Sequence, residues 1–140
     1  MAQTVGDIMT RVVVQMPAET NLVDAARAMR DRQIGNVLVT DHGTLMGLTT
    51  DRDIVVRAVA EAMDPSRTRL GEITTGDVVR IGLDASADEA ADVMRQQAVR
   101  RLVVTDHRGA VAGIVSLGDL ALAKDPSSAL GVISGAPSDE

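Results

Sequence analysis

Two short stretches pair a hydroxyl side chain with a carboxylate three residues later, each at the end of an apolar segment. The first is GLTTDRDI, residues 47–54, with Thr50 and Asp53; the second is GIVSLGDL, residues 113–120, with Ser116 and Asp119. This spacing is typical of a capped helix start. At a junction between a strand and a helix, the same groups could also hold a ribose. The carboxylate would accept from two vicinal hydroxyls, and nearby helix amides would attract a phosphate.

Both interpretations stay open on the residues alone. A capping box prefers Glu or Gln at its third position, because the longer side chain reaches back to the amide of the cap residue. Both stretches have Asp instead, which favours a ligand role. A duplication, however, copies a structural cap as faithfully as a binding site, so the recurrence alone does not decide between them.

The chain is a tandem duplication. Residues 5–42 and 70–107 share 13 identities in 38 positions at a constant shift of 65, and one insertion then aligns Gly47 with Gly113. Such a long common register indicates two structural repeats. We assign a first repeat to residues 5–62, a linker to 63–69, a second repeat to 70–124 and a tail to 125–140. The tail is rich in Ser, Gly and Pro, so we expect it to be flexible.

Each repeat predicts the order strand, helix, strand, strand, helix. β-Branched runs at residues 12–14 and 78–81 predict the first strands, and tight turns at 41–43 and 106–109 join the later pairs. Closing helices are expected to begin at Thr50 and Ser116. The longer helices should bury one apolar side, formed by Leu22, Ala25, Ala26 and Met29, and by Ala87, Ala90, Ala91 and Met94.

These elements predict a mixed α/β (α+β) fold. One repeat of roughly 60 residues makes a marginal core, so the two repeats are expected to pack against each other. An approximate twofold axis would relate them and would create two similar clefts between the halves.

Composition narrows the class of function. The net charge of −6 argues against a nucleic-acid partner, because binding to the phosphate backbone needs a concentrated basic surface. No apolar run could span a bilayer and no signal peptide opens the chain, so we expect a cytoplasmic protein with no membrane partner. The chain has no Phe, Trp or Tyr. A bound heterocycle would therefore lie between aliphatic side chains.

The sequence predicts neither a catalytic nor a metal site. His42 and His107 stand at equivalent turns, with no third ligand at metal-binding spacing, so we interpret both as turn residues. The chain also lacks a nucleophile elbow, a P-loop and a dinucleotide-binding glycine triplet. We expect a protein that is not an enzyme and that requires no cofactor.

The duplicated unit resembles the cystathionine β-synthase (CBS) domain pair, also called a Bateman module. VGDIMT, GLTTDRDI and GIVSLGDL occur in the order of the family's landmarks, and the resemblance extends from about Val5 to Lys124. It implies a module that binds adenosine-type ligands, such as AMP, ADP, ATP or S-adenosylmethionine, in the clefts between its repeats.

The resemblance also implies roles for individual residues. Asp53 and Asp119 would hold the ribose hydroxyls, while Thr50 and Ser116 would help with ribose or phosphate. The first strand of each repeat would supply apolar and backbone contacts to the base. These contacts map onto Val13, Val14, Val78 and Val79.

The chain departs from the family pattern at several positions. Leu38 and Val103 stand where many members carry Pro, so the contacts of the base at that edge are expected to differ. Arg52 lies in the first motif where the second has glycine, whereas Arg100 and Arg101 replace a Gly-Asn pair of the first repeat. We include these three arginines among the candidate ligand-binding residues and expect the two clefts to be unequal.

We therefore expect a stand-alone regulatory module that senses an adenine nucleotide and acts in trans on an unknown protein partner. Apolar helix faces on such modules usually pair, so the resemblance implies a homodimer. The alternative is a structural or protein-interaction module whose clefts are vestigial, and the missing Pro and the uneven arginines keep this alternative open.

Overall fold

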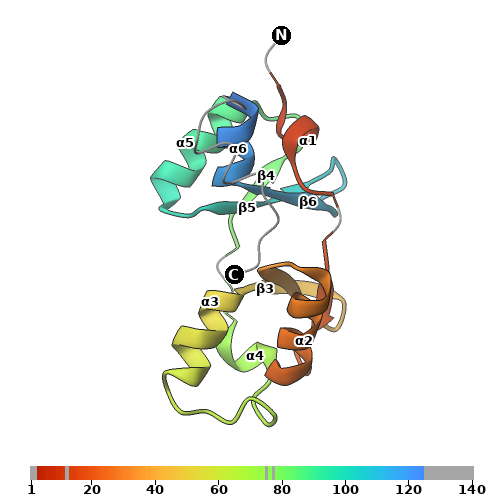
Figure 1. Cartoon of the computed structure of the whole chain (residues 1–140). Helices are drawn as coiled ribbons and strands as arrows, with labels where there is room; N and C mark the ends of the chain where they lie inside the picture. The colour runs from red at the N-terminus through yellow and green to blue at the C-terminus, as the bar shows by residue number, and fades with distance from the viewer. Residues whose placement is uncertain (1–2, 12, 75, 77, 125–140) are drawn as a thin grey trace. The chain divides into compact units, whose positions relative to one another are not determined.

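The computed structural model describes residues 3–11, 13–74, 76 and 78–124 (Figure 1). The predicted tail, residues 125–140, lies outside the described residues. No helix in the described part is long and apolar enough to cross a membrane. The elements are α1 Val5–Ile8, β1 Gln15–Pro17, α2 Leu22–Arg32, β2 Asn36–Asp41, β3 Thr44–Thr50, α3 Asp51–Ile54, the π-helix η1 Val55–Val59, α4 Leu70–Ile73, β4 Arg80–Gly82, α5 Ala87–Gln97, β5 Arg101–Thr105, β6 Val111–Ser116 and α6 Leu117–Lys124.

The described residues form two compact units. The β1–β3 unit contains residues 14–74, 76 and 78, and the β4–β6 unit contains residues 3–11, 13 and 79–124. These units are not the two sequence repeats. Helix α4 opens the second repeat but belongs to the β1–β3 unit, and helix α1 opens the first repeat but belongs to the β4–β6 unit.

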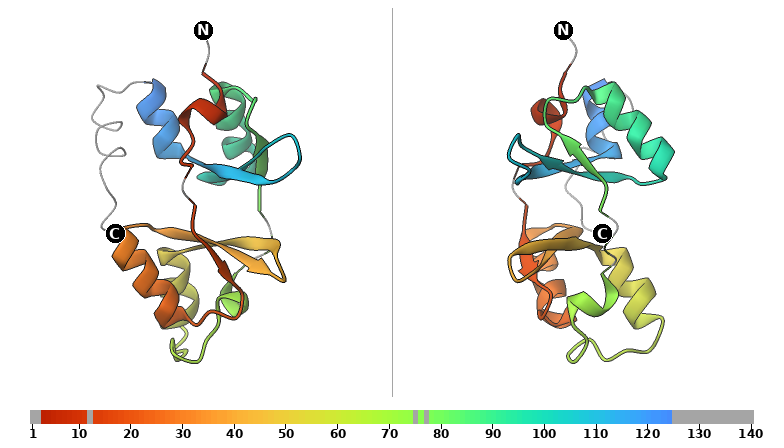
Figure 2. Two further views of the ribbon diagram at one scale, coloured as in Figure 1. Left: turned by 90° about the vertical axis from the view of Figure 1, so that its right-hand side faces the viewer. Right: turned by 180° about the vertical axis from the view of Figure 1, so that it is seen from behind.

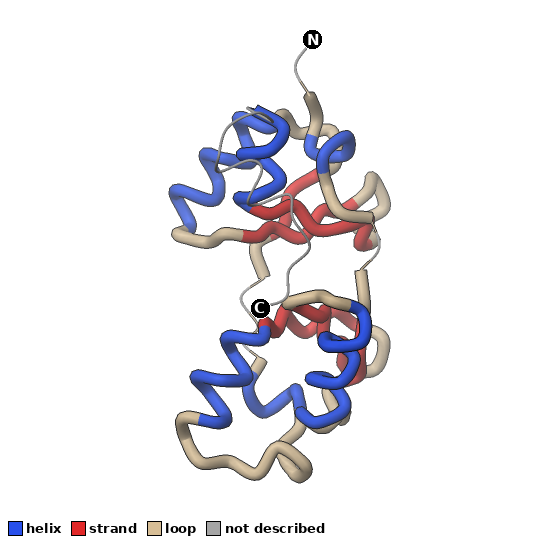
Figure 3. The backbone as a smooth tube through the Cα atoms, viewed as in Figure 1, coloured by secondary structure: helices blue, strands red, loops and turns tan. Residues whose placement is uncertain are grey.

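Each unit is built on a three-stranded sheet. In the β1–β3 unit, β1 pairs in parallel with β2, and β2 pairs antiparallel with β3. The β4–β6 unit repeats this order with β4, β5 and β6. The helices of each unit cover one face of its own sheet (Figures 2 and 3). The predicted mixed α/β fold is confirmed.

Each core combines a long helix, the central strand and a short helix from the other repeat. Leu70 and Ile73 of α4 complete one core, and Val5 of α1 completes the other with the nearby Met9. On α2 the predicted apolar side is correct for Leu22, Ala25 and Met29 but wrong for Ala26, which is exposed. A narrower stripe is buried because α2 packs on one side only.

The first strand of each repeat lies later than predicted. Strands β1 and β4 begin at Gln15 and Arg80, so the prediction of a strand at residues 12–14 is wrong for Val13 and Val14 and the one at 78–81 is partly right. Residue 12 lies outside the described residues. Val14 and Val79 precede the strands, and their carbonyl oxygens accept from the amides of Leu38 and Val103 at 2.9 and 3.0 Å. The parallel pairing therefore starts at these valines, and the regular strand follows them.

Left-handed residues close both hairpins at the predicted turns. His42 and Gly43 have φ values of 51° and 81°, as a two-residue turn between antiparallel strands requires. Gly109 has a φ of 81° in the longer second turn. His42 and His107 lie in turns, as interpreted from the sequence.

The linker between the repeats packs against α2. The amide of Leu22, at the start of that helix, donates to the carbonyl oxygens of Pro65 and Thr68 at 3.1 and 3.0 Å. Thr68 is buried, and Asp64 accepts from the amide and the hydroxyl of Ser66. Linker carbonyls thus satisfy a helix amide that has no partner within α2.

Gly113 lets the N-terminal segment pair with β6, and replacing it tests that contact. Thr10 and Ile114 exchange both backbone hydrogen bonds at 2.8 and 3.0 Å, and a Cβ on Gly113 would collide with the carbonyl oxygen of Thr10. We expect Gly113→Ala to lower the free energy of unfolding by about 1–3 kcal/mol in urea denaturation. Gly82→Ala is the matched control, because its Cβ meets no atom within 4 Å. Equal stability of both variants would contradict this account.

Candidate functional site

Both hydroxyl-carboxylate motifs lie where the last strand of a sheet becomes a helix. Thr50 ends β3 and is the cap residue of α3, while Ser116 ends β6 immediately before α6. The predicted starts of both closing helices are confirmed. The antiparallel strand ends here because the side chain of each cap residue bonds the backbone of the following turn.

The two motifs form complete capping boxes. The carboxylate of Asp53 accepts from the amide of Thr50 at 2.9 Å, and the Thr50 hydroxyl accepts from the amide of Asp53 at 3.1 Å. Asp119 and Ser116 make the same pair of bonds at 2.9 and 3.0 Å. Asp makes the reach-back bond here although a capping box prefers Glu or Gln, because the cap residue's extended backbone brings its amide within reach. Each such cap contributes about 1 kcal/mol to stability.

The chain uses the same reach-back at two other helix starts. The carboxylates of Asp7 and Glu72 accept from the amides of Thr4 and Arg69 at 3.0 and 2.6 Å. Neither of these helices follows a strand of its own sheet directly. A capping carboxylate is therefore a general device in this chain, and what distinguishes Asp53 and Asp119 is their place at a sheet end.

In the β1–β3 unit, candidate residues gather at one end of the sheet. Strands β1 and β2 run parallel and β3 runs against them, so the beginnings of β1 and β2 lie beside the end of β3. Val14 lies at the start of this parallel pair, and Thr50 is directly opposite Asn36. Val14 also packs on the core, which gives it a structural role whether or not it contacts a ligand.

The β4–β6 unit gathers the equivalent residues and adds a cation. Val79 lies at the start of the parallel pair, and Arg101 is directly opposite Ser116. Side chains of directly opposed residues share one face of a sheet, so Arg101 and Ser116 are neighbours. Arg100 is joined to the same junction through its carbonyl oxygen, which accepts from the Leu117 amide at 2.8 Å.

The valines predicted to contact the base are divided between the units. Val14 and Val78 belong to the β1–β3 unit, whereas Val13 and Val79 belong to the β4–β6 unit. Val14 lies in the same unit as Thr50 and Asp53, and Val79 lies in the same unit as Ser116 and Asp119. A role in binding stays a prediction for all four valines.

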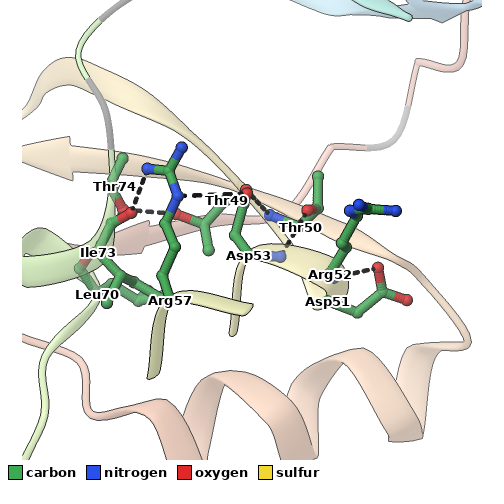
Figure 4. A network of polar contacts seen from close by, with 9 residues as sticks. All are labelled: Thr49, Thr50, Asp51, Arg52, Asp53, Arg57, Leu70, Ile73 and Thr74. Carbon is green, nitrogen blue, oxygen red and sulfur yellow. Dashed lines mark hydrogen bonds and ion pairs between the residues drawn. The ribbon is translucent and has the colours of Figure 1, made fainter. Parts of the chain in front are cut away.

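Arg57 is the cation nearest to Asp53 among the described contacts (Figure 4). Its Nε lies 3.8 Å from Oδ1 of Asp53, and its Nη1 donates to the carbonyl oxygen of Ile73 at 3.1 Å. The two side chains are 43% and 29% exposed, so solvent screens the ion pair and its contribution to stability is at most about 1 kcal/mol. Arg52, the cation predicted from the motif, is exposed and points away from Arg57.

A network of threonine hydroxyls holds the C-terminal end of α4, where Ile73 lies, against the sheet. The Thr74 hydroxyl donates to the carbonyl oxygen of Leu70 at 2.6 Å and is hydrogen-bonded to the hydroxyl of Thr49. Thr49 is fully buried beside Thr50, so it places this network next to the motif. Helix α4 is thus tied to the end of β3 through Thr49 and to the start of the closing helix through Arg57.

Sequence reasoning missed Arg57. It follows Asp53 by four residues, a spacing at which an acid and a base on a helix meet, and this signal was available. At the shift of 66 residues, Arg57 aligns with Ala123 of the second repeat, so the second motif has no arginine at this position of its closing helix. The bond to Ile73 had no such signal, because its acceptor is a backbone carbonyl.

Each motif presents a fixed carboxylate with one oxygen bonded to the cap amide. In Asp53 that oxygen is Oδ2, which leaves Oδ1 facing Arg57 and available to a donor. A diol is a donor of this kind, whereas a metal ion would need more ligands. No group of three His, Cys, Asp or Glu side chains that could hold a metal occurs among the residues described.

A cavity of about 230 Å³ in the β4–β6 unit lies apart from the motif residues. Leu120 and Ala123 contribute to it from α6, but Ser116 and Asp119 do not line it. The remaining lining comes from the N-terminal segment and the start of α5: Gln3, Ser86, Ala87, Asp88 and Ala91. It is not part of the candidate site.

Comparison with known proteins identifies the family. The CBS domain model matches residues 5–60 and 70–125. The chain is 34% identical over 119 residues to the CBS domain-containing protein YhcV of Bacillus subtilis, covering 85% of this chain and 84% of that protein. A CBS-domain-containing protein from Agrobacterium tumefaciens superposes with a TM-score of 0.77 at 31% identity, covering 89% of this chain and 95% of that one.

A second solved structure, hypoxic response protein I with two coordinated zinc ions, matches with a TM-score of 0.72 at 32% identity. That match covers 85% of this chain and 97% of the other. The duplicated sequence, the two sheets with their capped closing helices, and these matches agree: the chain belongs to the CBS domain family, with two CBS domains in tandem.

Proposed function

We propose that this chain is a non-catalytic regulatory module that binds an adenosine-type ligand through its two hydroxyl-carboxylate motifs. CBS-domain proteins are commonly regulatory modules. Asp53 and Asp119 each hold the ribose hydroxyls, with Thr50 and Ser116 assisting, and aliphatic side chains enclose the base. The ligand is AMP, ADP, ATP or S-adenosylmethionine, and the module acts in trans on a protein partner.

One observation carries the proposal. Each capping box fixes its carboxylate at a sheet end, and in Asp53 only Oδ2 is used by the cap amide. A preorganised acceptor gains affinity because no side-chain freedom is lost on binding. Hydrogen bonds to a charged acceptor contribute about 1.5–3 kcal/mol each, more than the screened pair with Arg57 contributes. A ribose diol would therefore win the competition for Oδ1.

A scaffold without ligand is the second candidate, and the capping boxes themselves favour it. Asp7 makes the same reach-back bond with no binding role assigned, and the Thr4 amide that donates to it lowers the pKa of its carboxyl. A capping role would account for Asp53 and Asp119 in the same way, with no ligand.

The zinc of hypoxic response protein I is not proposed for this chain, which has no Cys and two His.

Titration with nucleotides separates the two candidates. We expect at least one of AMP, ADP, ATP and S-adenosylmethionine to give a saturable calorimetric signal. At a hundredfold excess over its Kd, that ligand should stabilise the fold by about 2.7 kcal/mol. Asp53→Asn and Asp119→Asn should each weaken binding at one site by about tenfold or more, because the amide keeps an oxygen for the cap but loses the charge.

Asp7→Asn is the matched control, since it changes a capping carboxylate that lies in neither motif. It should leave the titration unchanged. If all three Asn variants lose a little stability and none changes affinity, or if no nucleotide binds, the scaffold candidate is correct.

We further propose that the module forms a homodimer through the closing helix of the β1–β3 unit. Val55, Val56 and Val59 of η1 are 56%, 50% and 57% exposed and neighbour one another along the helix. Three adjacent exposed valines are unfavourable in water, and a second copy of the same apolar strip would cover them. The π-helix turns Ala58 into the core and leaves these valines outside.

A charge on this strip tests the homodimer. We expect Val56→Glu to halve the mass measured by light scattering, because an unpaired carboxylate would be buried against the second copy. Ala26→Glu is the control, since it places the same charge at an exposed alanine of α2. A monomeric wild-type protein, or a Val56→Glu dimer, would refute the interface.

A further inference from the structure

We propose that Arg57 is a positioning residue that couples occupancy of the Asp53 motif to the end of α4. This inference rests on the proposed function, because it requires that a ribose engages Asp53. The contacts of the described residues give the first motif such a bridge and give the second motif none.

A single guanidinium bridges the two groups. Nη1 of Arg57 donates to the carbonyl oxygen of Ile73 at 3.1 Å, and Nε lies 3.8 Å from Oδ1 of Asp53. Figure 4 shows the side chain extending from the closing helix toward α4 between these partners. The guanidinium is planar and rigid, so a shift that moves one of its nitrogens also moves the other.

The ribose and Arg57 would compete for the same atom. Oδ2 of Asp53 is occupied by the Thr50 amide, so Oδ1 is the oxygen offered to both. The pair with Arg57 is half exposed and longer than a hydrogen bond, whereas a hydroxyl can approach Oδ1 closely. Ligand binding would therefore loosen the contact between Asp53 and Arg57.

The other end of the bridge lies five residues before Val78, after which the chain enters the other unit. Ile73 ends α4, and its carbonyl has no partner within the helix. The following amide, that of Thr74, donates to the carbonyl of Leu70 at 3.0 Å and forms the last bond of the helix. Val79, five residues later, already belongs to the other unit. A change at Ile73 therefore acts on the last peptide group of α4.

The second motif lacks this bridge. Ala123 occupies the position of Arg57, and an alanine cannot reach a carbonyl on another helix. Helix α1, the counterpart of α4, is held by its own backbone: the amides of Val5 and Gly6 donate to the carbonyl oxygens of Ala85 and Leu83 at 2.8 and 2.9 Å. Among the contacts of the described residues, no single side chain joins Asp119 to α1, which makes the second motif an internal control.

The first experiment needs no ligand. Amide hydrogen exchange of α4 is measured in the wild type, Arg57→Met, Asp53→Asn and the double variant; Met keeps the aliphatic stem. We expect Arg57→Met to raise exchange at Thr74 by about two- to fivefold, Asp53→Asn to raise it less, and the double variant to match Arg57→Met. Asp119→Asn should not change exchange at Met9, the equivalent amide of α1. If the two substitutions raise exchange at Thr74 additively in the double variant, Asp53 does not act through Arg57 and the bridge is refuted.

The second experiment uses adenosine, which has no phosphate to contact Arg57, and the Asp119→Asn variant as background. We expect adenosine to raise exchange at Thr74, and expect it to bind the Arg57→Met protein at least as tightly without that response. Binding with no change at Thr74 overturns the coupling and leaves the proposed function intact. Absence of binding by adenosine and by every nucleotide above overturns the proposed function and, with it, regulation through Arg57.

Discussion

The capping box at the end of the third strand is the interaction on which the arrangement of each unit depends. Thr50 with Asp53, and Ser116 with Asp119, exchange two hydrogen bonds where an extended chain must turn into a helix. These bonds satisfy amides that the sheet can no longer pair and fix the direction of the closing helix. They also hold a carboxylate rigidly at a sheet end, so the group that stabilises the fold is the same group to which the proposed function assigns the ligand.

The two repeats share this junction but surround it with different cations. In the β1–β3 unit the cation comes from the closing helix, where Arg57 contacts Asp53 and Ile73. In the β4–β6 unit the cation comes from the neighbouring strand, where Arg101 stands opposite Ser116. The two motifs are therefore electrostatically distinct although both keep the same cap.

Local features of the fold could be predicted from the sequence, whereas contacts between elements that are distant in the sequence could not. The duplicated register, the long helices and the hairpin turns follow from periodicity and from residues such as Gly43 that accept a positive φ. The strand predicted at residues 12–14 lies too early because that β-branched run ends at Val14, where pairing with β2 begins, whereas the run at 78–81 overlaps β4. Four-residue helices leave no periodic pattern, so α1 and α4 were not foreseen. The pairing of Arg57 with Asp53 was visible in the spacing, but its bond to the Ile73 carbonyl was not.

Exchange of the short helices between the units has a consequence for how such a chain can be divided. Leu70 and Ile73, which begin the second repeat, are buried in the core formed by the first, and Val5 is buried in the core formed by the second. Cutting the polypeptide in the linker would separate each core from some of the side chains that are buried in it. A lone repeat could complete itself only by borrowing the opening helix of another molecule, so a single-repeat ancestor of this architecture would have been an obligate swapped pair.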